Sequence, residues 1–421
     1  MSFPDIRRSR RWLSVEELRI LILLFILLIG LLALNIYLAR SLPGGEWFYL
    51  RWSGARAFLF ENVEPYSRTI AERVQELIYG RIATSTEYPY VLNDPFFIVL
   101  LYTPIALFPD FSLARGIWML LSEAALIGTV LFTLSLLEWE PPGWLMISLL
   151  GFGLFSFFSL QSLLAASPTI FLIFIYLAIL VALRSYSDEL AGALLFLVAY
   201  QWEVGALFFL YILIMVFANR RWGVLTGFGM SLFLALVVSF LIYSGWGLPY
   251  IRAVLSDWIR GVSLNLNSVL AFWIPNSRFS IAAIVSAVIT VVVFIEWIAS
   301  TRSNFRRILW TSSLSLAATP LVGFAIFPSN HVVLIPALIL ILMLVWERWI
   351  RQRVLAYLLV FSVALLVPFG LYYRSLTVED RLYSDLLTVL PPVVTILGLY
   401  WMRWWVLHSP RTWMDQIGVH R

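Results

Sequence analysis

The segment ILILLFILLIGLLALNIYL, residues 20–38, places this chain in a membrane. It carries no charge, and about 20 apolar residues are what one helix needs to cross the hydrocarbon core of a bilayer. A cleavable signal peptide has a shorter apolar core and a small-residue exit, so we interpret this segment as a permanent anchor. A cluster of four arginines lies upstream, and the positive-inside rule therefore predicts a cytoplasmic N-terminus; the cluster is Arg7, Arg8, Arg10 and Arg11.

The rest of the chain has the same apolar character. Of its 421 residues, 61% are hydrophobic and only 13% are charged, and the mean hydropathy is +0.89. A soluble domain could not bury that much apolar surface, so lipid is the solvent for most of the chain. The alternation of apolar and polar residues that marks membrane β-strands is absent. We expect one all-α polytopic membrane domain over residues 1–421.

Every one of the 29 basic residues is arginine, and the chain contains no lysine and no cysteine. Without cysteine there is no disulfide, no thiolate metal site and no cysteine nucleophile. The arginine usage reflects either genome composition or selection for bidentate phosphate contacts, and both interpretations stay open. The net charge is +5. We expect membrane lipids and no nucleic acid among the partners.

About twelve membrane spans are expected, with both termini and the tail 406–421 in the cytoplasm of a bacterial or archaeal plasma membrane. Arginine clusters near 184, 220, 302–307, 348–353 and 403–411 fix this orientation. Two spans must then lie between Arg184 and Arg220, so the chain turns at Gln201–Glu203. The spans are 20–38, 112–137, 144–160, 167–183, 189–200, 203–218, 223–244, 279–299, 306–327, 332–347, 353–372 and 384–405.

The remaining polar turns face outward in this topology, which predicts an active site at the outer face. They include the loop 41–94, expected to be catalytic, a second loop 245–277, and the turn at 328–331. The segment 95–109, interrupted by prolines, is expected to be an interfacial or re-entrant helix. Residues 65–81 and 249–262 are predicted to be amphipathic helices lying flat on the membrane. Thr69 and Glu72 have the spacing of a capping box.

Two carboxylates are candidates for catalysis. Sugar transfer from a lipid phosphate releases an anion, so one base for the acceptor hydroxyl and cations for the phosphate would suffice. Glu46 is the favoured base; alternatively it is an ordinary solvated carboxylate. Asp94 is the second candidate, although an aspartate at this point is commonly a helix N-cap. Glu123, inside a span, either binds substrate or pairs with a polar neighbour.

The remaining candidates would bind the donor phosphate or the substrate. Arg51 and Arg56 lie on the outer side and either hold the phosphate or extend toward lipid headgroups. His331 could donate to the phosphate or ligate a metal, but a lone histidine does not make a metal site, and none is predicted. Polar residues from the other outward turns complete the predicted set: Asn330, Gln201, Glu203 and Asn267.

Three ordered stretches resemble the polyprenol-phosphate-sugar-dependent membrane glycosyltransferases of glycosyltransferase family 87. This family belongs to the GT-C superfamily and includes mycobacterial mannosyltransferases of glycolipid synthesis. The stretches are Gly45-Glu46-Trp47-Phe48 with Ala55-Arg56-Ala57 and Glu64-Pro65-Tyr66, then residues 95–109, and last Thr319-Pro320 with Asn330-His331 and Pro336.

The resemblance implies a GT-C-like bundle that transfers a single sugar, with inversion, from a polyprenyl phosphate to a lipid, glycan or protein. Mannose is one candidate sugar, and no cofactor is implied besides this donor substrate. The family's acidic base falls on Glu46, where aspartate is more usual, and its histidine near the donor phosphate falls on His331.

The chain also departs from the family pattern, which keeps two other functions open. The family's Tyr-Pro-Pro reads Asn93-Asp94-Pro95 here, its Gly-Gln reads Ala165-Ala166, and its Lys-Pro reads Gln201-Trp202-Glu203. One alternative is a non-catalytic lipid-binding or scaffold protein on the same fold. The other is a transporter of lipid-linked glycans, against which count the few polar residues deep in the spans and the lack of an internal repeat.

Overall fold

A computed structural model describes residues 15–84, 87–260, 265–274, 281–324, 326–378 and 381–407, and this part of the chain is all-helical without a strand, as predicted. The arginines before residue 15 and nearly all of the tail 406–421 lie outside it. The helices are α1 (Val15–Ser41), α2 (Glu46–Phe60), α3 (Arg68–Tyr79), α4 (Phe96–Leu101), α5 (Thr103–Ala106), α6 (Phe111–Leu137), α7 (Gly143–Phe155), α8 (Phe157–Leu164), α9 (Thr169–Arg184), α10 (Asp188–Val198), η1 (Ala199–Gln201), α11 (Trp202–Ala218), α12 (Trp222–Ile242), α13 (Gly247–Arg260), α14 (Leu266–Trp273), α15 (Ile281–Ser300), α16 (Phe305–Ala318), η2 (Thr319–Val322), η3 (Pro328–Leu334), α17 (Ile335–Arg348), α18 (Arg353–Thr377) and α19 (Arg381–Leu407).

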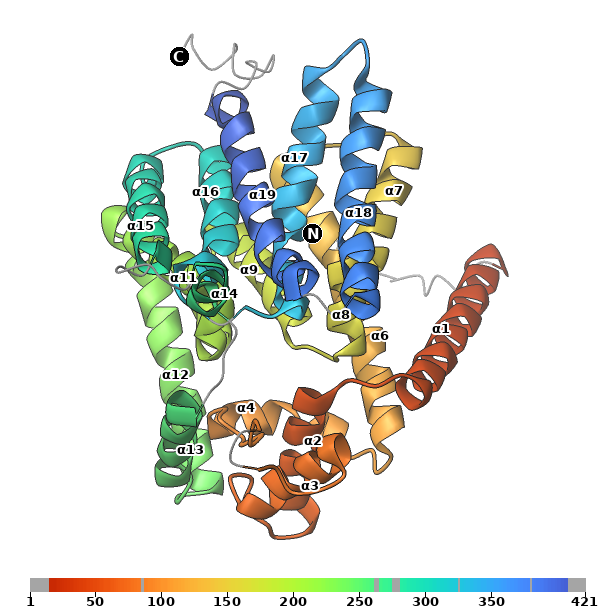
Figure 1. The fold of residues 1–421 in the computed structure, drawn as a ribbon, viewed down its shortest axis with the longest axis vertical. Coiled ribbons are helices and arrows are strands. Elements are labelled where there is room, and N and C mark those ends of the chain that lie inside the picture. Colours follow the sequence, from red (N-terminus) through yellow and green to blue (C-terminus); the bar gives the residue numbers. More distant parts are fainter. Residues whose placement is uncertain are drawn as a thin grey trace, which may run out of the picture.

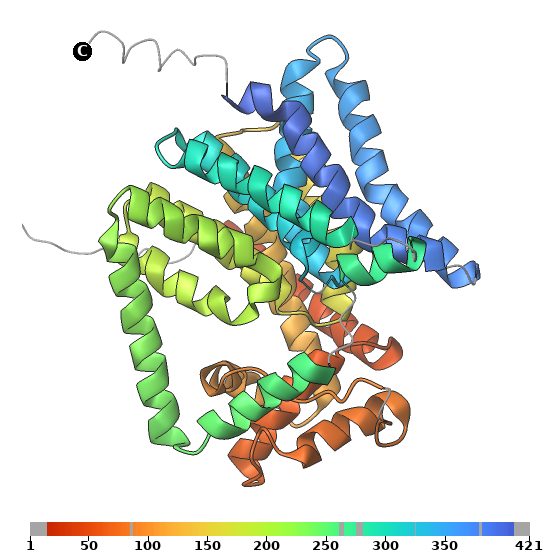
Figure 2. The same cartoon turned by 60° about the vertical axis from the view of Figure 1, so that its left-hand side comes forward.

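The helices form two bodies, a bundle of long helices and a small layer below it made of α2–α5 and α13 (Figure 1). Each has its own apolar core, one between the long helices and one centred on α2 and α4. Figure 2 shows α12 descending from the bundle into α13, which lies across the small layer. Tyr200 packs against both cores and therefore joins the two bodies.

Several helices are long and apolar enough to cross a membrane, which supports a multi-pass membrane protein. Among the described residues there are eight such segments, one of them the α10–α11 unit at residues 188–218, or nine if α7 and α8, which meet at 43°, form one bent span. The expected twelve crossings are therefore met only in part. The helix α9 has 16 residues, fewer than the roughly 20 that a straight span requires.

The chain reverses at Gln201–Glu203, as predicted. The Arg221 guanidinium, just after α11, hydrogen-bonds the carboxylate of Asp188 at the start of α10 and the Leu183 carbonyl at 2.8 Å. The two ends of the α10–α11 unit therefore lie side by side. Although residues 188–218 are long enough in total for one span, they form two short helices that fold back.

The arginine clusters gather at one end of the bundle, here called the arginine end. The Arg184 guanidinium binds Glu138, Arg403 binds Glu296 at 2.9 Å, and the Arg348 guanidinium lies 5.2 Å from the Trp401 ring. Figure 1 shows the turns between α15 and α16 and between α17 and α18 at this end, with the small layer at the other. That opposite end is called the loop end.

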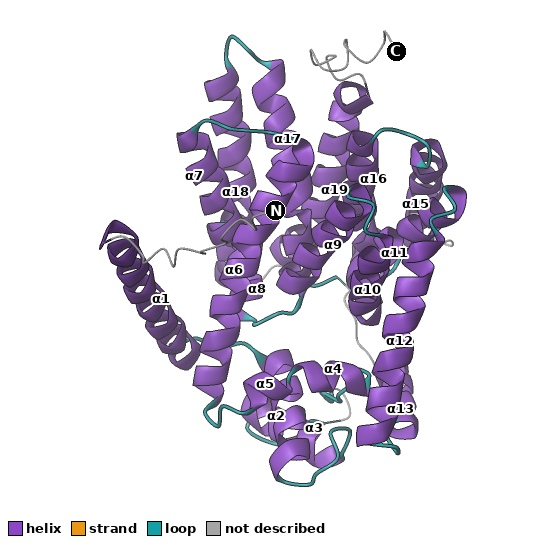
Figure 3. Ribbon diagram, turned by 180° about the vertical axis from the view of Figure 1, so that it is seen from behind, coloured by secondary structure: helices purple, strands orange, loops and turns teal. Residues whose placement is uncertain are grey.

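Helix α1 contacts the bundle only through its last turns. Its apolar residues 20–29 are each between 48% and 67% exposed, and Figures 1 and 3 show the helix leaning away from the bundle. Near its end Asn35 is buried and donates to Glu123 on α6 at 3.2 Å. Glu123 therefore pairs with a polar neighbour, the second of the two interpretations offered for it.

The two predicted amphipathic helices form but differ in their surroundings. Ile70 and Val74 of α3 are fully buried against the small layer, so this part of its apolar face meets protein, contrary to prediction, while Leu77 is 54% exposed. Helix α13 instead exposes Ile251 and Leu255. The predicted capping box is absent, because Ser67 precedes α3 and Glu72 accepts from Arg68 at 2.7 Å.

The segment 95–109 does not form one continuous helix. It contains α4 and α5, of six and four residues, with Pro104 in the first turn of α5. Both are too short to cross a bilayer, and their buried residues belong to the core of the small layer. Their interfacial or re-entrant placement stays a prediction.

Candidate functional site

Glu46 is the first residue of α2 and is partly exposed at the loop end. The chain enters the helix through Gly44 and Gly45, whose φ angles are +116° and +87°. Residues with a side chain rarely adopt such angles, which is why glycine stands at both positions. A carboxylate in the first turn of a helix is also stabilised by the helix dipole. The two glycines thus define where α2 begins, and Glu46 is the acidic residue at its first position.

Arg115, near the start of α6, holds this turn in place. Its side chain is almost fully buried. Its Nη1 donates to the carbonyls of Ala39 and Leu42 at 3.1 and 3.0 Å, and its Nη2 donates to Pro43 at 3.3 Å and to Leu164. A Cβ on Gly45 would lie 3.0 Å from Arg115 Nε. The charge of Arg115 also acts on Glu46 across this turn.

A chain of hydrogen bonds connects the turn before Glu46 to the Asn330–His331 turn. Leu164, which Arg115 binds, ends α8, and Ser162 in the last turn of α8 donates to the Ser329 carbonyl. Asn330 follows directly, and its Oδ1 accepts from Thr169 at 2.9 Å. The first loop and the Asn330–His331 turn, far apart in sequence, are therefore connected at one end of the bundle. Glu46 does not line the pocket beside this turn, so the expected shared cavity stays a prediction.

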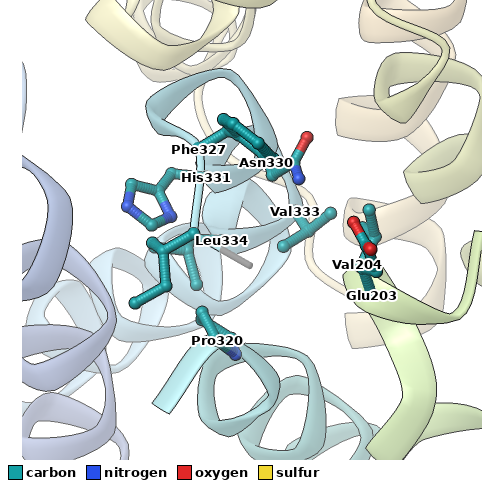
Figure 4. Close-up of a pocket in the computed structure, with 9 residues that line it drawn as sticks. Glu203, Val204, Pro320, Phe327, Asn330, His331, Val333 and Leu334 are labelled. Atoms are coloured by element: carbon teal, nitrogen blue, oxygen red, sulfur yellow. The ribbon is translucent and has the colours of Figure 1, made fainter. Parts of the chain in front are cut away.

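A small pocket lies beside this turn (Figure 4). Glu203 and Val204 of α11 form one wall, and Asn330, His331 and residues of η2 and η3 form the other. Glu203 and Asn330, both predicted from sequence, therefore lie together with His331. Gln201 is close in sequence but its Oε1 is buried and has no hydrogen-bond partner among the described residues. Asn267 is exposed on α14 and does not line the pocket.

The contacts of His331 define which of its ring nitrogens is available. Nε2 lies 2.7 Å from the Thr388 carbonyl of α19. A carbonyl oxygen only accepts, so Nε2 carries the proton, and in the neutral ring Nδ1 is left as an acceptor. The ring is buried and stands edge-on to Phe158, with centroids 5.2 Å apart. A substrate group would therefore meet Nδ1.

Arg51 and Asp94 bind each other. Arg51 Nε and Nη2 donate to the two oxygens of Asp94 at 2.6 and 3.1 Å, and both side chains are buried. Burial disfavours the charged guanidinium, but attraction to Asp94 outweighs this and raises the pKa of Arg51. Asp94 is not an N-cap, because Pro95 precedes α4 and no side chain caps that helix.

Arg56 is also occupied by protein groups. Its Nη1 donates to the Ala106 carbonyl at 3.0 Å, and its guanidinium lies 5.0 Å from the Phe60 ring. Together with the Arg51–Asp94 pair, this means that the two arginines expected to hold the lipid phosphate serve to join α2 to α4 and α5.

Two features of the loop end were missed in the sequence. Arg115 stands in an apolar span at the end opposite the other arginine clusters, and this breach of the positive-inside pattern was the signal that could have revealed it. The second is a group of aromatic residues near Glu46, which includes Trp47 and Tyr90. In the described part of the chain, no group of three or more histidine and acidic side chains could hold a metal ion.

Comparison with models of known protein families, with curated proteins and with solved structures gave no match. The resemblance to glycosyltransferase family 87 is therefore carried by sequence motifs alone and stays a prediction.

Proposed function

We propose that this protein is an integral membrane glycosyltransferase that transfers one sugar from a polyprenyl phosphate to an acceptor hydroxyl. The observation that carries the proposal is the joining of Glu46, through Arg115, to the end of the bundle that holds the pocket of Glu203, Asn330 and His331. A partly exposed carboxylate on a helix start whose preceding turn Arg115 holds suits base catalysis. The sequence resemblance supports the same reaction class.

In this reaction Glu46 accepts the proton of the acceptor hydroxyl. The acceptor oxygen then attacks the anomeric carbon of the donor sugar from the side opposite the phosphate. The bond between that carbon and the phosphate oxygen breaks, and the polyprenyl phosphate leaves as an anion with the electron pair. The configuration at the anomeric carbon inverts. No general acid is required, because the leaving phosphate is stable without a proton.

Asn330 is the donor that we assign to the phosphate. The Thr169 hydroxyl accepts from Ser167 at 2.9 Å and donates to Asn330 Oδ1 at the same distance. This arrangement fixes the orientation of the amide, so that Asn330 Nδ2 presents its hydrogens to a ligand. In the proposed membrane orientation the loop end faces outward, about twelve segments cross the plasma membrane, and both termini are cytoplasmic.

The test is a transfer assay on the purified protein in nanodiscs, with a panel of radiolabelled polyprenyl-phosphate sugars and a native lipid extract. Glu46→Gln keeps the shape but removes the proton acceptor, so turnover should fall by about 10²-fold or more while the labelled donor still binds. Glu76→Gln, an exposed carboxylate on α3, is the matched control and should leave turnover unchanged. Full turnover in Glu46→Gln, or no product with any donor, would overturn the proposal and favour the scaffold function.

A further inference from the structure

Several polar contacts hold the loop that follows α3. Its described residues, 81–84 and 87–90, are here called the fastened loop. Gln75 is buried and uses both ends of its amide, donating to the Pro89 carbonyl at 2.6 Å and accepting from the Ala83 amide at 2.9 Å. Arg81 binds both oxygens of Glu87 at 2.8 and 2.7 Å. These contacts hold the described residues 81–84 and 87–90 in place before any ligand arrives, which lowers the entropic cost of binding.

This loop places two tyrosines against α2 to form an aromatic group. The Trp47 ring lies 5.4 Å from each of the Tyr88 and Tyr90 rings, and these two lie 5.1 Å apart. All three side chains are partly exposed. Rings this close touch one another, so nothing enters between them, in contrast to an aromatic cage for a cation. A ligand must lie on their outer surface.

Tyr90 adopts a backbone conformation that is unfavourable for a bulky residue. Its φ is +47°, and such strain persists only where surrounding contacts enforce it, commonly at functional sites. Burial, with smaller contributions from Tyr79 and Glu46, raises the pKa of Tyr90 to about 12. Its hydroxyl therefore stays protonated at neutral pH, and it already forms a side-chain hydrogen bond with Tyr79. Glu46 directly precedes Trp47 in the first turn of α2, and its charge acts on the Tyr90 hydroxyl.

We propose that Trp47, Tyr88 and Tyr90, together with Glu46, form a saccharide platform that binds a pyranose ring. One face of a pyranose is lined by C–H groups and packs on aromatic rings, while its hydroxyl groups donate to a carboxylate or to a tyrosine oxygen. A lipid acceptor without a sugar would use neither the rings nor the fastened loop. The assignment of this sugar as the acceptor rests on the proposed function, and it names that acceptor as a glycan.

Binding is tested by saturation-transfer NMR and calorimetry on the full-length protein in phosphatidylcholine nanodiscs, free of glycoside detergents. The probes are methyl α-mannopyranoside, methyl α-glucopyranoside and the corresponding disaccharides. We expect saturation of the ring C–H protons, and a loss of affinity of about tenfold or more in Trp47→Ala. Tyr186→Ala is the control, because that ring is 85% exposed at the arginine end, and it should bind as the unaltered protein does.

A second variant separates binding from folding. Tyr90→Gly removes the ring but relieves the positive φ, so the melting temperature should be kept while sugar binding falls. Absence of saturation with every probe, or equal binding by Trp47→Ala, overturns the platform. Sugar binding without any transfer product would leave the platform standing and reject the enzyme. Transfer to a sugar-free lipid, with no glycoside bound, would support the enzyme and reject the platform.

Discussion

The Arg51 guanidinium donates two hydrogen bonds, of 2.6 and 3.1 Å, to the Asp94 carboxylate inside the small layer. The Tyr66 hydroxyl adds a bond of 2.9 Å to the Asp94 carbonyl. The pair therefore joins α2 to the residue before α4, and neither partner is free to act as a base or to bind a phosphate. This leaves Glu46 as the catalytic candidate of the first loop.

Breaking this pair should unfold the small layer more easily. In Asp94→Asn the Arg51 charge stays buried without its partner, and the expected loss of stability is about 3–5 kcal/mol. The combination of Arg51→Met with Asp94→Leu should recover most of that loss, because apolar groups then replace both charges. Thermal unfolding of the detergent-solubilised protein measures both. A mild effect of Asp94→Asn alone would contradict a structural role for the pair.

Arg115→Met should loosen the turn that precedes Glu46. Four carbonyl acceptors lose their charged donor, and hydrogen bonds to charged groups contribute about 1.5–3 kcal/mol each. Amide exchange of residues 42–49 should therefore accelerate. Arg40→Met is the matched control, because Arg40 forms an ion pair with Asp110 in which the side chains are 62% and 47% exposed, and such surface pairs contribute about 0–1 kcal/mol. Equal exchange in the two variants would show that Arg115 does not hold the turn.

The orientation of the protein in the membrane can be determined with single-cysteine variants, since the chain has no cysteine of its own. Asn62 at the loop end and Gln352 at the arginine end are both exposed. An impermeant maleimide added to intact cells should label Asn62→Cys and not Gln352→Cys, because the arginine end is expected to be cytoplasmic. The opposite labelling pattern would invert the topology and move the proposed site to the cytoplasm.

Glutamine and asparagine in place of His331 should differ in their effect on the melting temperature, because only the glutamine amide reaches the position of Nε2. The amide nitrogen of glutamine reaches about as far as Nε2, so His331→Gln should keep the bond to Thr388. Asparagine is too short, and His331→Asn leaves that carbonyl without its donor, at a cost of about 1–3 kcal/mol. The melting temperature should therefore fall further for asparagine than for glutamine. An equal fall would mean that the bond to Thr388 is dispensable.

The fastened loop should open in acid. The Arg81 hydrogen bonds lower the pKa of Glu87 from 4.5 to about 2. A lowered pKa means that this contribution is complete above about pH 4.5 and is lost as the pH falls through about 2. Amide exchange of residues 81–90 should accelerate across that window, and Glu87→Gln should exchange quickly at every pH. An unaltered acid profile in Glu87→Gln would show that another group holds the loop.

Much of the architecture could be predicted because it depends on local properties of the chain. The apolar segments require helices in a membrane, and arginine is costly to move across it, so the clusters gathered at one end as expected. The turn at Gln201–Glu203 followed from the same rule. The same rule predicted that the first loop and the Asn330–His331 turn lie at the same end of the bundle, but it could not tell whether they share a pocket, and Glu46 does not line the one beside His331.

Only the tertiary structure decided which partners the polar groups bind and which way the amphipathic helices face. The sequence favoured a helix cap at Asp94, whereas the structure pairs its carboxylate with Arg51, 43 residues away. Arg115 donates to carbonyls of two segments that are distant in sequence. Helices α3 and α13 carry similar apolar stripes, yet α3 buries Ile70 and Val74 in protein, whereas α13 exposes Ile251 and Leu255. A stripe of apolar residues specifies only that it avoids water, and both a protein core and a lipid bilayer satisfy that requirement.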